Sequence, residues 1–431
     1  MVTALFVPVR DRMHLLRQNS LVMNAFYLMF STLVVAASGF VFWVLVTQHY
    51  PTSAVGVATT LLSLSGLLSL LGLAGFDAAM VRFLPGLEQK KAYINSSFTL
   101  VGTASVVVAL GAALLLPRIS HSLIMLEEPA TLAAFVFFTA ISSLNILAGA
   151  VFLAFKQARY TFVITLLFCT AKVLLPLLVT QGSAATIFLL AGIAQLVGLM
   201  LNIAWIHRKC NHRFSLSIDV HVFRLVRKFS LFMYGASILN LLPPTLLPLI
   251  ILHFMAPQSA AYYYMAFTIA SVLYTVAYAS MQSAFAEGSH NKDALKSHIT
   301  RAIKLVAVLL LPAAFLAYIL SGILLSPFGA DYAQFASQLL QLFAMSALPV
   351  AAYSMLGAIF KVTKNLRAAL VMNTAYAVAI LGFSYWLVPR IGIMAVGWAW
   401  LVGNIIACII GLLYVTLIKG GKDAKTSGSW R

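Results

Sequence analysis

The chain has 431 residues, of which 62% are hydrophobic and only 9% are charged. Typical soluble domains are roughly 45–50% apolar and about 25% charged, so this composition argues against an array of soluble domains. The formal net charge of +18 suggests a nucleic-acid-binding protein only until the positions of the basic residues are considered.

The 28 lysine and arginine residues gather in seven clusters, which occupy every second gap between apolar runs. Only Arg118, Lys172 and Arg390 lie outside these clusters. Cationic loops stay on the cytoplasmic side of an inserted chain, so the pattern places both termini in the cytoplasm. The natural counter-charge is then the anionic lipid headgroup, and we expect no nucleic-acid partner.

Apolar runs of 18 or more residues predict transmembrane helices, and twelve such runs follow one another along the chain. Their even number agrees with two cytoplasmic termini. The outward loops between them are too short to hold a catalytic domain. The predicted helices are 20–48, 53–75, 94–116, 129–155, 160–180, 184–206, 229–254, 260–285, 304–326, 335–360, 366–388 and 392–418.

An internal repeat links the fourth and tenth predicted helices. Residues 149–159 and 357–367 both read G-A-[VI]-F-x3-K-[QN]-x-R. The pattern predicts an all-α polytopic membrane protein with two six-helix bundles, related by a pseudo-two-fold axis along the membrane normal. Coincidence in apolar sequence, or cationic anchoring of helix ends, is the alternative. The predicted divisions are a cytoplasmic segment 1–19, a bundle 20–206, a basic cytoplasmic linker 207–228, a bundle 229–418 and a cytoplasmic tail 419–431.

Signals for metal or cofactor chemistry are missing from the sequence. Cys169, Cys210 and Cys408 form no spacing motif, and the nine histidines are scattered, so we expect neither a disulfide framework nor a metal site. There is no phosphate-binding loop motif, and we expect no cofactor. The triplet Asn95-Ser96-Ser97 matches the glycosylation acceptor pattern, but it falls on the predicted cytoplasmic side.

Six polar side chains in the predicted helix 260–285 recur at spacings of three and four residues, which places them on one face. In a bilayer such a stripe must face protein or water. One interpretation is a wetted, substrate-binding cavity between the bundles, since Gln and Tyr pack poorly at close helix contacts. The other is helix–helix packing. The stripe comprises Tyr264, Thr268, Ser271, Thr275, Tyr278 and Gln282.

The first predicted helix carries a sparser polar face, led by Asn24 and continued by Ser31 and Ser38. Here the cavity and packing interpretations are evenly balanced. In the seventh predicted helix, Pro243, Pro244 and Pro248 form an unusually dense cluster. Proline removes a backbone donor and bends a helix, so the cluster is a candidate hinge, although prolines also occur in static membrane helices.

Lys172 is the one charged residue near the middle of a predicted span, where it costs ~2.5–3.5 kcal/mol on insertion scales. A cavity-facing functional role and snorkelling to the membrane surface are the two interpretations. At the inner end of the second helix, Asp77 and Arg82 form either a local ion pair or a site that presents Arg82 to an incoming anion. No acidic residue lies in the middle of a predicted span, which favours an anionic substrate.

Four stretches carry a family resemblance: 24–39, the segment G-L-A-G-F-D-A-A-M-V-R-F-L-P at 72–85, the two Gly149 and Gly357 repeats, and 389–399. The segment 72–85 is the most specific of them. Together with the helix count, they resemble the polysaccharide transporters, or O-antigen-type oligosaccharide flippases, of the multidrug/oligosaccharidyl-lipid/polysaccharide flippase superfamily.

The resemblance implies a V-shaped pair of bundles around a cationic cavity, in a bacterial cytoplasmic membrane. It implies that a lipid-linked glycan, with undecaprenyl diphosphate as the lipid, moves from the cytoplasmic to the outer leaflet by alternating access. Lys172 and Arg82 are the candidates to neutralise the diphosphate, and the polar stripe to bind the glycan. Glycan polymerase and other surface-polysaccharide assembly proteins are candidate partners, and no enzymatic activity is expected.

Two other functions remain open at this point. A multidrug antiporter of the same superfamily would share the fold, but it should carry a carboxylate in the first bundle to hold its cation. A membrane-embedded enzyme of glycan assembly would need clustered acids or histidines at one depth, or a large outer loop.

Overall fold

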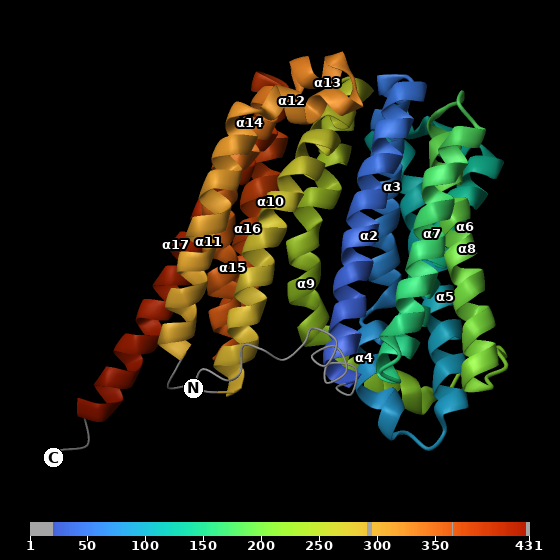
Figure 1. The fold of residues 1–431 in the computed structure, drawn as a ribbon, viewed down its shortest axis with the longest axis horizontal. Helices are drawn as coiled ribbons and strands as arrows, with labels where there is room; N and C mark the ends of the chain where they lie inside the picture. The colour runs from blue at the N-terminus through green and yellow to red at the C-terminus, as the bar shows by residue number, and fades with distance from the viewer. Residues whose placement is uncertain (1–19, 291–294, 364, 428–431) are drawn as a thin grey trace, which may run out of the picture. The chain divides into compact units, whose positions relative to one another are not determined.

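The structure is a computed structural model that describes residues 20–290, 295–363 and 365–427, nearly all of them helical (Figure 1). Eight of the described helices are long and apolar enough to cross a membrane, and ten spans result if each of two bent pairs counts as one. The predicted all-α, multi-pass membrane fold is therefore confirmed.

The chain divides into two compact units. The N-terminal unit comprises residues up to Tyr50, Leu68–Arg118 and Ile124–Leu231, and the C-terminal unit comprises Pro51–Leu67, Ile119–Leu123 and the residues from Phe232 onward. Helix α3 (Thr52–Leu73) contributes to both. The other helices before the linker are α2 (Ser20–His49), α4 (Phe76–Phe83), α5 (Lys90–Ile119), α6 (Pro129–Ala154), α7 (Ala158–Leu178) and α8 (Ala184–Cys210).

Helix α9 (Val220–Phe254) begins the second half of the chain, and long helices correspond one to one with the remaining predicted spans. Two of those spans are broken. The helices after α9 are α10 (Pro257–His290), α11 (Leu295–Ile319), α12 (Ser321–Leu325), α13 (Ala330–Phe335), α14 (Ser337–Met345), α15 (Ala347–Val362), α16 (Leu366–Ile391) and α17 (Met394–Ser427).

The breaks divide the predicted helices 304–326 and 335–360, each of which was expected to be continuous. The first bends by 82° between α11 and α12, and the second by 42° between α14 and α15. The second bend has a clear cause, because the ring of Pro349 clashes with the carbonyl group four residues earlier, at Met345, where α14 ends.

The non-helical part of the linker is shorter than the predicted segment 207–228. Helix α8 continues to Cys210 and ends at Asn211, which adopts the left-handed conformation (φ 46°) that commonly terminates helices. Helix α9 already begins at Val220, within the predicted linker. Only residues 211–219 therefore lie between the two helices.

The two copies of the repeat form the same turn. In the first copy, the backbone N–H of Gln157 donates to Phe152 O and that of Phe155 donates to Val151 O. In the second copy, Asn365 donates to Phe360 O and Thr363 to Ile359 O, at the corresponding positions. Shared backbone hydrogen bonds support a true structural repeat over a chance match in apolar sequence.

Small polar residues hold α3, α5 and α6 together in the N-terminal unit. Ser105 Oγ donates to Ser143 Oγ (2.7 Å), and Ser143 Oγ lies 2.9 Å from the carbonyl oxygen of Ser69. A Cβ atom on Gly72 would lie 2.2 Å from Ser105 Oγ, so only glycine allows this approach. Close contact between small residues is a common way for helices to associate in membranes.

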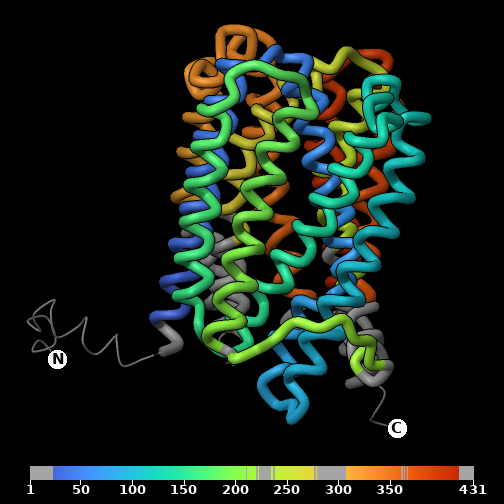
Figure 2. The backbone as a smooth tube through the Cα atoms, turned by 90° about the vertical axis from the view of Figure 1, so that its right-hand side faces the viewer, coloured from blue at the N-terminus to red at the C-terminus, as the bar shows by residue number. Residues whose placement is uncertain are grey.

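The linker segment 211–219 is bound to the first turns of α5 by side-chain hydrogen bonds (Figure 2, yellow-green segment along the lower end). Asn95 Oδ1 accepts from His212 Nε2 (2.9 Å) and from the backbone N–H of Ser215 (3.2 Å). Asn95 Nδ2 also donates to Ser215 Oγ (2.7 Å). Asn95, which matches the glycosylation acceptor pattern in sequence, is therefore a buried structural residue, with 7% of its surface exposed.

His212 is the most buried residue of this segment, with 1% of its surface exposed. Because Asn95 Oδ1 can only accept, His212 Nε2 carries the proton and Nδ1 is left as a buried acceptor without a partner. Burial lowers the pKa of the His212 imidazole, and the nearby charges of Lys91 and His207 lower it further.

We expect the contact between linker and α5 to weaken in acid. A folded-state pKa below the unfolded value of about 6.5 means that the stabilisation is present above that value and is lost as the pH falls through the folded pKa. Hydrogen–deuterium exchange of residues 211–219, corrected for intrinsic rates, should be faster at about pH 5.5 than at about pH 7.5.

The control is His212→Gln, whose amide can still donate to Asn95 but does not titrate. This variant should lose the pH dependence while it keeps slow exchange. Equal pH dependence in the variant and the wild type would contradict the role assigned to His212.

Candidate functional site

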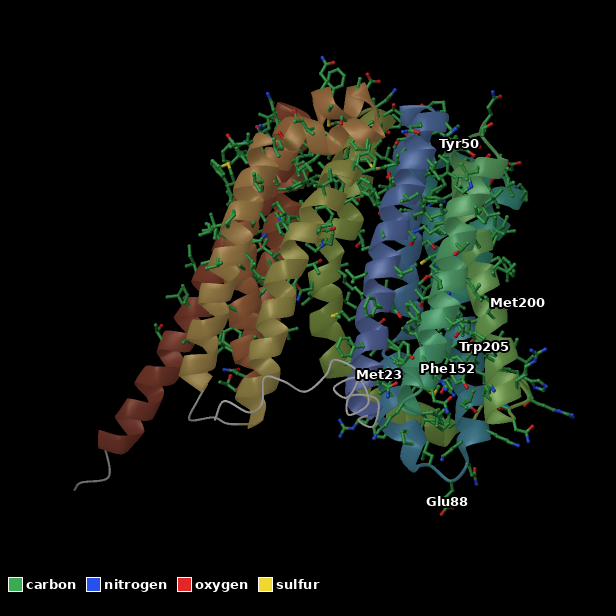
Figure 3. The ribbon with its side chains drawn as sticks, in the orientation of Figure 1. Met23, Tyr50, Glu88, Phe152, Met200 and Trp205 are labelled. Atoms are coloured by element: carbon green, nitrogen blue, oxygen red, sulfur yellow. The ribbon has the colours of Figure 1, made fainter. Side chains whose placement is uncertain are left out.

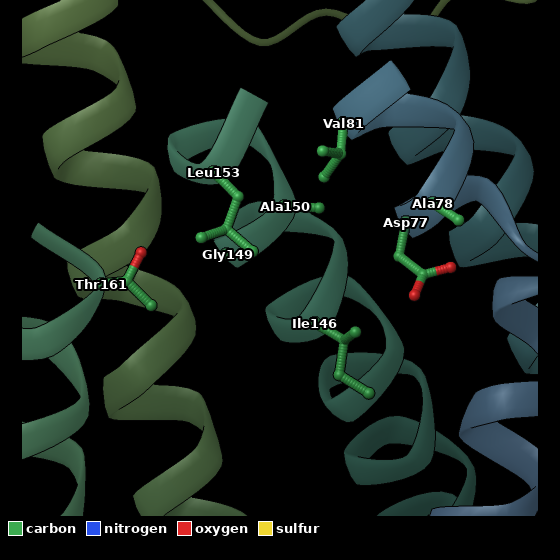
Figure 4. Close-up of a pocket in the computed structure, with 8 residues that line it drawn as sticks. All are labelled: Asp77, Ala78, Val81, Ile146, Gly149, Ala150, Leu153 and Thr161. Carbon is green, nitrogen blue, oxygen red and sulfur yellow. The ribbon is translucent and has the colours of Figure 1, made fainter. Parts of the chain in front are cut away.

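A pocket in the N-terminal unit is built from the two most distinctive sequence motifs (Figure 4). Its volume is about 220 Å³. Segment 72–85 supplies α4, and segment 149–159 supplies the end of α6, while one residue comes from the start of α7. The lining residues are Asp77, Ala78, Val81, Ile146, Gly149, Ala150, Leu153 and Thr161.

The local backbone brings Asp77 to this pocket. Helix α3 ends at Leu73, and the next two residues, Ala74 (φ 46°) and Gly75 (φ 81°), are both left-handed. Glycine adopts this conformation without steric cost, which explains the tight turn that starts α4 in a new direction. Asp77 then lies in the first turn of α4, where the helix dipole favours a negative charge.

Two residues that line this pocket each carry a buried oxygen atom without a hydrogen-bond partner. Asp77 Oδ1 and Thr161 Oγ1 are buried and unpartnered, and so is Gln157 Oε1, one helical turn before Thr161. Two of these three atoms can only accept hydrogen bonds. Buried polar atoms are normally satisfied, so the arrangement suits a donor or a cation as an occasional occupant.

One carboxylate oxygen of Asp77, Oδ1, is buried without a hydrogen-bond partner, and the local ion pair with Arg82 stays a prediction. The two residues are five positions apart, so they face different sides of α4. Arg82 is exposed and its guanidinium lies 5.5 Å from the ring centroid of Phe83. Its predicted role in binding an anion stays a prediction.

Lys172 projects from α7 toward α2, where its Nζ lies 5.0 Å from the ring centroid of Phe42. Phe42 is almost fully buried and contacts Trp43 edge-on. No described carboxylate lies within salt-bridge distance of Lys172. The aromatic face therefore stabilises this cation within the helix pair, by an interaction worth up to about 2 kcal/mol when desolvated.

The polar stripe of α10 borders a tightly packed aromatic core, which lies on the adjoining side of the same helix. Tyr263 and Tyr274 are buried against Phe267, Phe343 and Trp400, whereas Thr275 and Tyr278 are exposed. Along the stripe, the hydroxyl groups of Thr268, Ser271 and Thr275 donate to carbonyl oxygens of their own helix. The side chain of Gln282 lies outside the described residues.

Asn24 has a structural task at the predicted cytoplasmic end of the N-terminal unit. Its Oδ1 accepts a hydrogen bond from the backbone N–H of Ala158 (3.0 Å), the first residue of α7. Helix N-termini leave such donors unsatisfied, so Asn24 caps α7 from a neighbouring helix. Its acceptor oxygen is thereby occupied, and its predicted role toward substrate has no support from this contact.

The three clustered prolines lie inside α9, which remains helical through them. Because Pro248 lacks an N–H group, it cannot donate the helical hydrogen bond to the carbonyl oxygen of Pro244. The Tyr263 hydroxyl donates to that oxygen instead (3.3 Å). Thr245 Oγ1 donates to Leu241 O (2.6 Å). The carbonyl group that Pro248 leaves without its usual donor thus has a partner, while the function of the prolines as a hinge stays a prediction.

In each of the two repeat helices, a polar side chain four residues before the motif forms hydrogen bonds with two other side chains. The sequence patterns did not reveal these two residues. In the N-terminal unit Asn145 bonds Gln195 (2.8 Å) and Asn202 (2.7 Å). In the C-terminal unit the Tyr353 hydroxyl lies 2.6 Å from Asn240 Oδ1 and 2.7 Å from Asn373 Oδ1. Asn145 and Tyr353 occupy equivalent repeat positions, which is the signal that could have identified them.

Stacked aromatic rings lie at the end of the N-terminal unit where Asn24 caps α7, near the side chains labelled Phe152 and Trp205 in Figure 3. Tyr160 lies between them, with ring centroids 5.8 Å from Phe152 and 5.7 Å from Trp205. The guanidinium of Arg159 lies 4.6 Å from the Tyr160 ring centroid, and Lys209 Nζ lies 5.9 Å from it. Cations stacked on aromatic rings at a helix end suit a membrane–water interface.

Solved structures of membrane transporters share this fold. An inward-facing multidrug resistance MATE family transporter of the MOP superfamily superposes with a TM-score of 0.73 at 15% identity, over 94% of this chain and 99% of that one. The lipid II flippase MurJ, in an inward closed conformation, gives a TM-score of 0.72 at 13% identity, over 92% and 87%. No curated protein sequence matches the chain.

Fold and helix pattern thus define a two-unit, multi-pass membrane protein that shares the fold of these solved structures. The family described as "Polysaccharide biosynthesis protein" matches residues 51–337, more than half of the chain. The chain belongs to this family, and the resemblance seen in the sequence is confirmed at that level.

We expect Lys172→Ala to insert normally and to reduce transport. Losing a hydrogen bond to a charged partner costs about 1.5–3 kcal/mol, which corresponds to roughly a ten- to hundredfold loss of transport rate if Lys172 binds the substrate anion. The readout is surface polysaccharide in a deletion strain at matched protein levels.

Lys172→Arg retains the charge and should retain most of the transport. Arg390→Ala is the matched control, because Arg390 also stacks on an aromatic ring, that of Trp386, but lies at a helix end. Full transport by Lys172→Ala would remove Lys172 from the substrate site.

Proposed function

We propose that the protein translocates a lipid-linked oligosaccharide, with undecaprenyl diphosphate as its lipid carrier, from the cytoplasmic to the outer leaflet of the bacterial cytoplasmic membrane. The cargo serves cell-surface polysaccharide assembly, including O-antigen of lipopolysaccharide. Both termini face the cytoplasm, and the protein works as a transporter without enzymatic activity. Glycan polymerase and other assembly proteins are its proposed protein partners.

Membership of the polysaccharide biosynthesis family is the observation that carries this proposal. The fold shared with a lipid flippase supports it, because the same architecture moves a lipid-linked molecule in that protein. Lys172 supports it further, since a cation held in an apolar helix pair suits the diphosphate of the cargo better than a cationic drug.

Cation export is the second candidate function, and the Asp77 pocket is the observation that favours it. A carboxylate in the first bundle was the feature expected of an antiporter. Asp77 provides one at the end of this bundle, with a buried oxygen that lacks a partner. MATE transporters share the fold as well.

The leaflet distribution of lipid-linked glycan tests the proposed function. In a strain that lacks the gene, we expect the glycan to accumulate on the cytoplasmic leaflet and surface polysaccharide to fall. Enzymatic accessibility of the glycan should be compared in intact spheroplasts and lysed ones. A normal distribution between the leaflets would contradict flipping of that glycan.

Asp77→Asn distinguishes the two functions, because it removes the charge and preserves the shape of the side chain. The proposed function predicts unchanged tolerance to cationic drugs in this variant and in the deletion strain. Cation export predicts that both lose tolerance, at least about fourfold, because a buried carboxylate would hold the cation. Thr161→Val is the matched control in the same pocket, since it removes a polar atom without changing the charge.

A further inference from the structure

The extended segment 213–219 has two different sides. The backbone N–H groups of Ser215, Ser217 and Asp219 point toward α5, where they donate to Asn95 Oδ1 (3.2 Å), Thr99 Oγ1 (3.3 Å) and Ser96 Oγ (3.0 Å). The intervening residues project away. Leu216 is 91% exposed and Ile218 is 65% exposed. Alternation of this kind is the normal geometry of extended chain.

The segment covers a particular face of α5. Asn95 and Thr99 stand at the start of a stripe with three- and four-residue spacing, and the stripe continues along the helix through large apolar side chains. Those side chains are exposed: Val106 by 42%, Leu110 by 40% and Leu114 by 59%. An exposed apolar stripe on a spanning helix faces lipid, so the segment lies on the lipid-facing side of α5.

Hydrogen bonds from α5 satisfy part of the segment's backbone, which lowers the cost of placing non-helical chain near hydrocarbon. An unsatisfied N–H group in that environment is costly, so extended chain is ordinarily excluded from it. Here alternate N–H groups are satisfied by three α5 side chains. The outward-facing Leu216 and Ile218 would gain free energy from contact with acyl chains.

The charges around the segment match an anionic membrane surface. Arg208, Lys209 and Arg213 are exposed close to it, as is Lys91 at the start of α5. The nearby carboxylates are those of Glu88, in the loop before α5, and Asp219. Basic residues this close to an anionic lipid surface are attracted to it electrostatically.

We propose that residues 213–219 form an interfacial segment of the membrane-embedded surface, with Leu216 and Ile218 inserted at the acyl-chain boundary and Arg208, Lys209 and Arg213 bound to anionic lipid phosphates. The segment is then an integral part of the lipid-facing surface of the N-terminal unit. This inference does not depend on the cargo that the protein transports.

Fluorescence of a polarity-sensitive probe tests the depth of the segment. The full-length protein, with Cys169, Cys210 and Cys408 replaced by serine or alanine, carries a single labelled cysteine at position 216, 218 or 88. It is placed in nanodiscs of phosphatidylcholine with or without phosphatidylglycerol. Position 88 is the aqueous control, because Glu88 lies at the exposed tip of its loop (Figure 3).

We expect probes at positions 216 and 218 to show blue-shifted emission and at least about twofold stronger quenching by brominated lipids than the probe at 88. Phosphatidylglycerol should increase both the blue shift of the emission and the quenching by brominated lipids. If iodide quenches the probes at 216 and 218 as strongly as the probe at 88, the surface is aqueous and the proposal is wrong. Equal behaviour with and without phosphatidylglycerol would overturn the anionic part of the proposal.

A second measurement avoids the labels. In nanodiscs that contain phosphatidylglycerol, the thermal midpoint of the unmodified protein should exceed that in phosphatidylcholine alone. Leu216→Asp should reduce this difference, whereas Ser215→Ala, on the inner side of the same segment, should retain it. Reduction of the difference by both variants alike would contradict insertion, because it would indicate a loss of local structure in the linker.

Discussion

Polar groups inside a membrane-spanning protein must find their partners on the chain itself, because the hydrocarbon offers none. Most features of this structure follow from that requirement. Hydroxyl groups along α10 bond carbonyl oxygens of their own helix, Tyr263 supplies the donor that Pro248 lacks, and Asn145 and Tyr353 join neighbouring helices. Where the requirement is unmet, as at Asp77 and Thr161, a buried polar atom costs free energy that a bound ligand could recover.

Helix positions could be predicted from the sequence because each span must be long and apolar, and both properties can be read directly from composition. The breaks in two of the spans could not be predicted, since apolar content carries no information about the direction in which a helix runs. Pro349 gave a partial signal for the bend at Ser346, and the Ser321-Gly322 pair gave one for the sharper bend at Leu320. The start of α9 within the predicted linker 207–228 could not be predicted either, because charge marks the side of the membrane and says nothing about where a helix begins.

Candidate site residues divide in a similar way. Lys172 could be identified from the sequence, since a charge in an apolar run is conspicuous, but its contact with Phe42 depends on the packing of α2 against α7. The pocket at Asp77 was hidden for the same reason. Its walls come from segments about seventy residues apart, and both were known only as motifs. Asn24 shows the opposite case, because the sequence marks it as polar but does not show that it caps α7, and its role toward substrate stays a prediction.

The contact between α5 and the linker has a consequence for how this family can vary. Asn95 serves His212 and Ser215 at once, so substitutions on the two stretches should be coupled, and a relative that loses one partner should change the other. The length of the segment between α8 and α9 is constrained more strongly than the identity of its residues. A single inserted residue between Cys210 and Leu216 would reverse the alternation of the extended segment and turn leucine toward the amide of Asn95. Insertions and deletions should therefore avoid this loop, although loops usually tolerate them well.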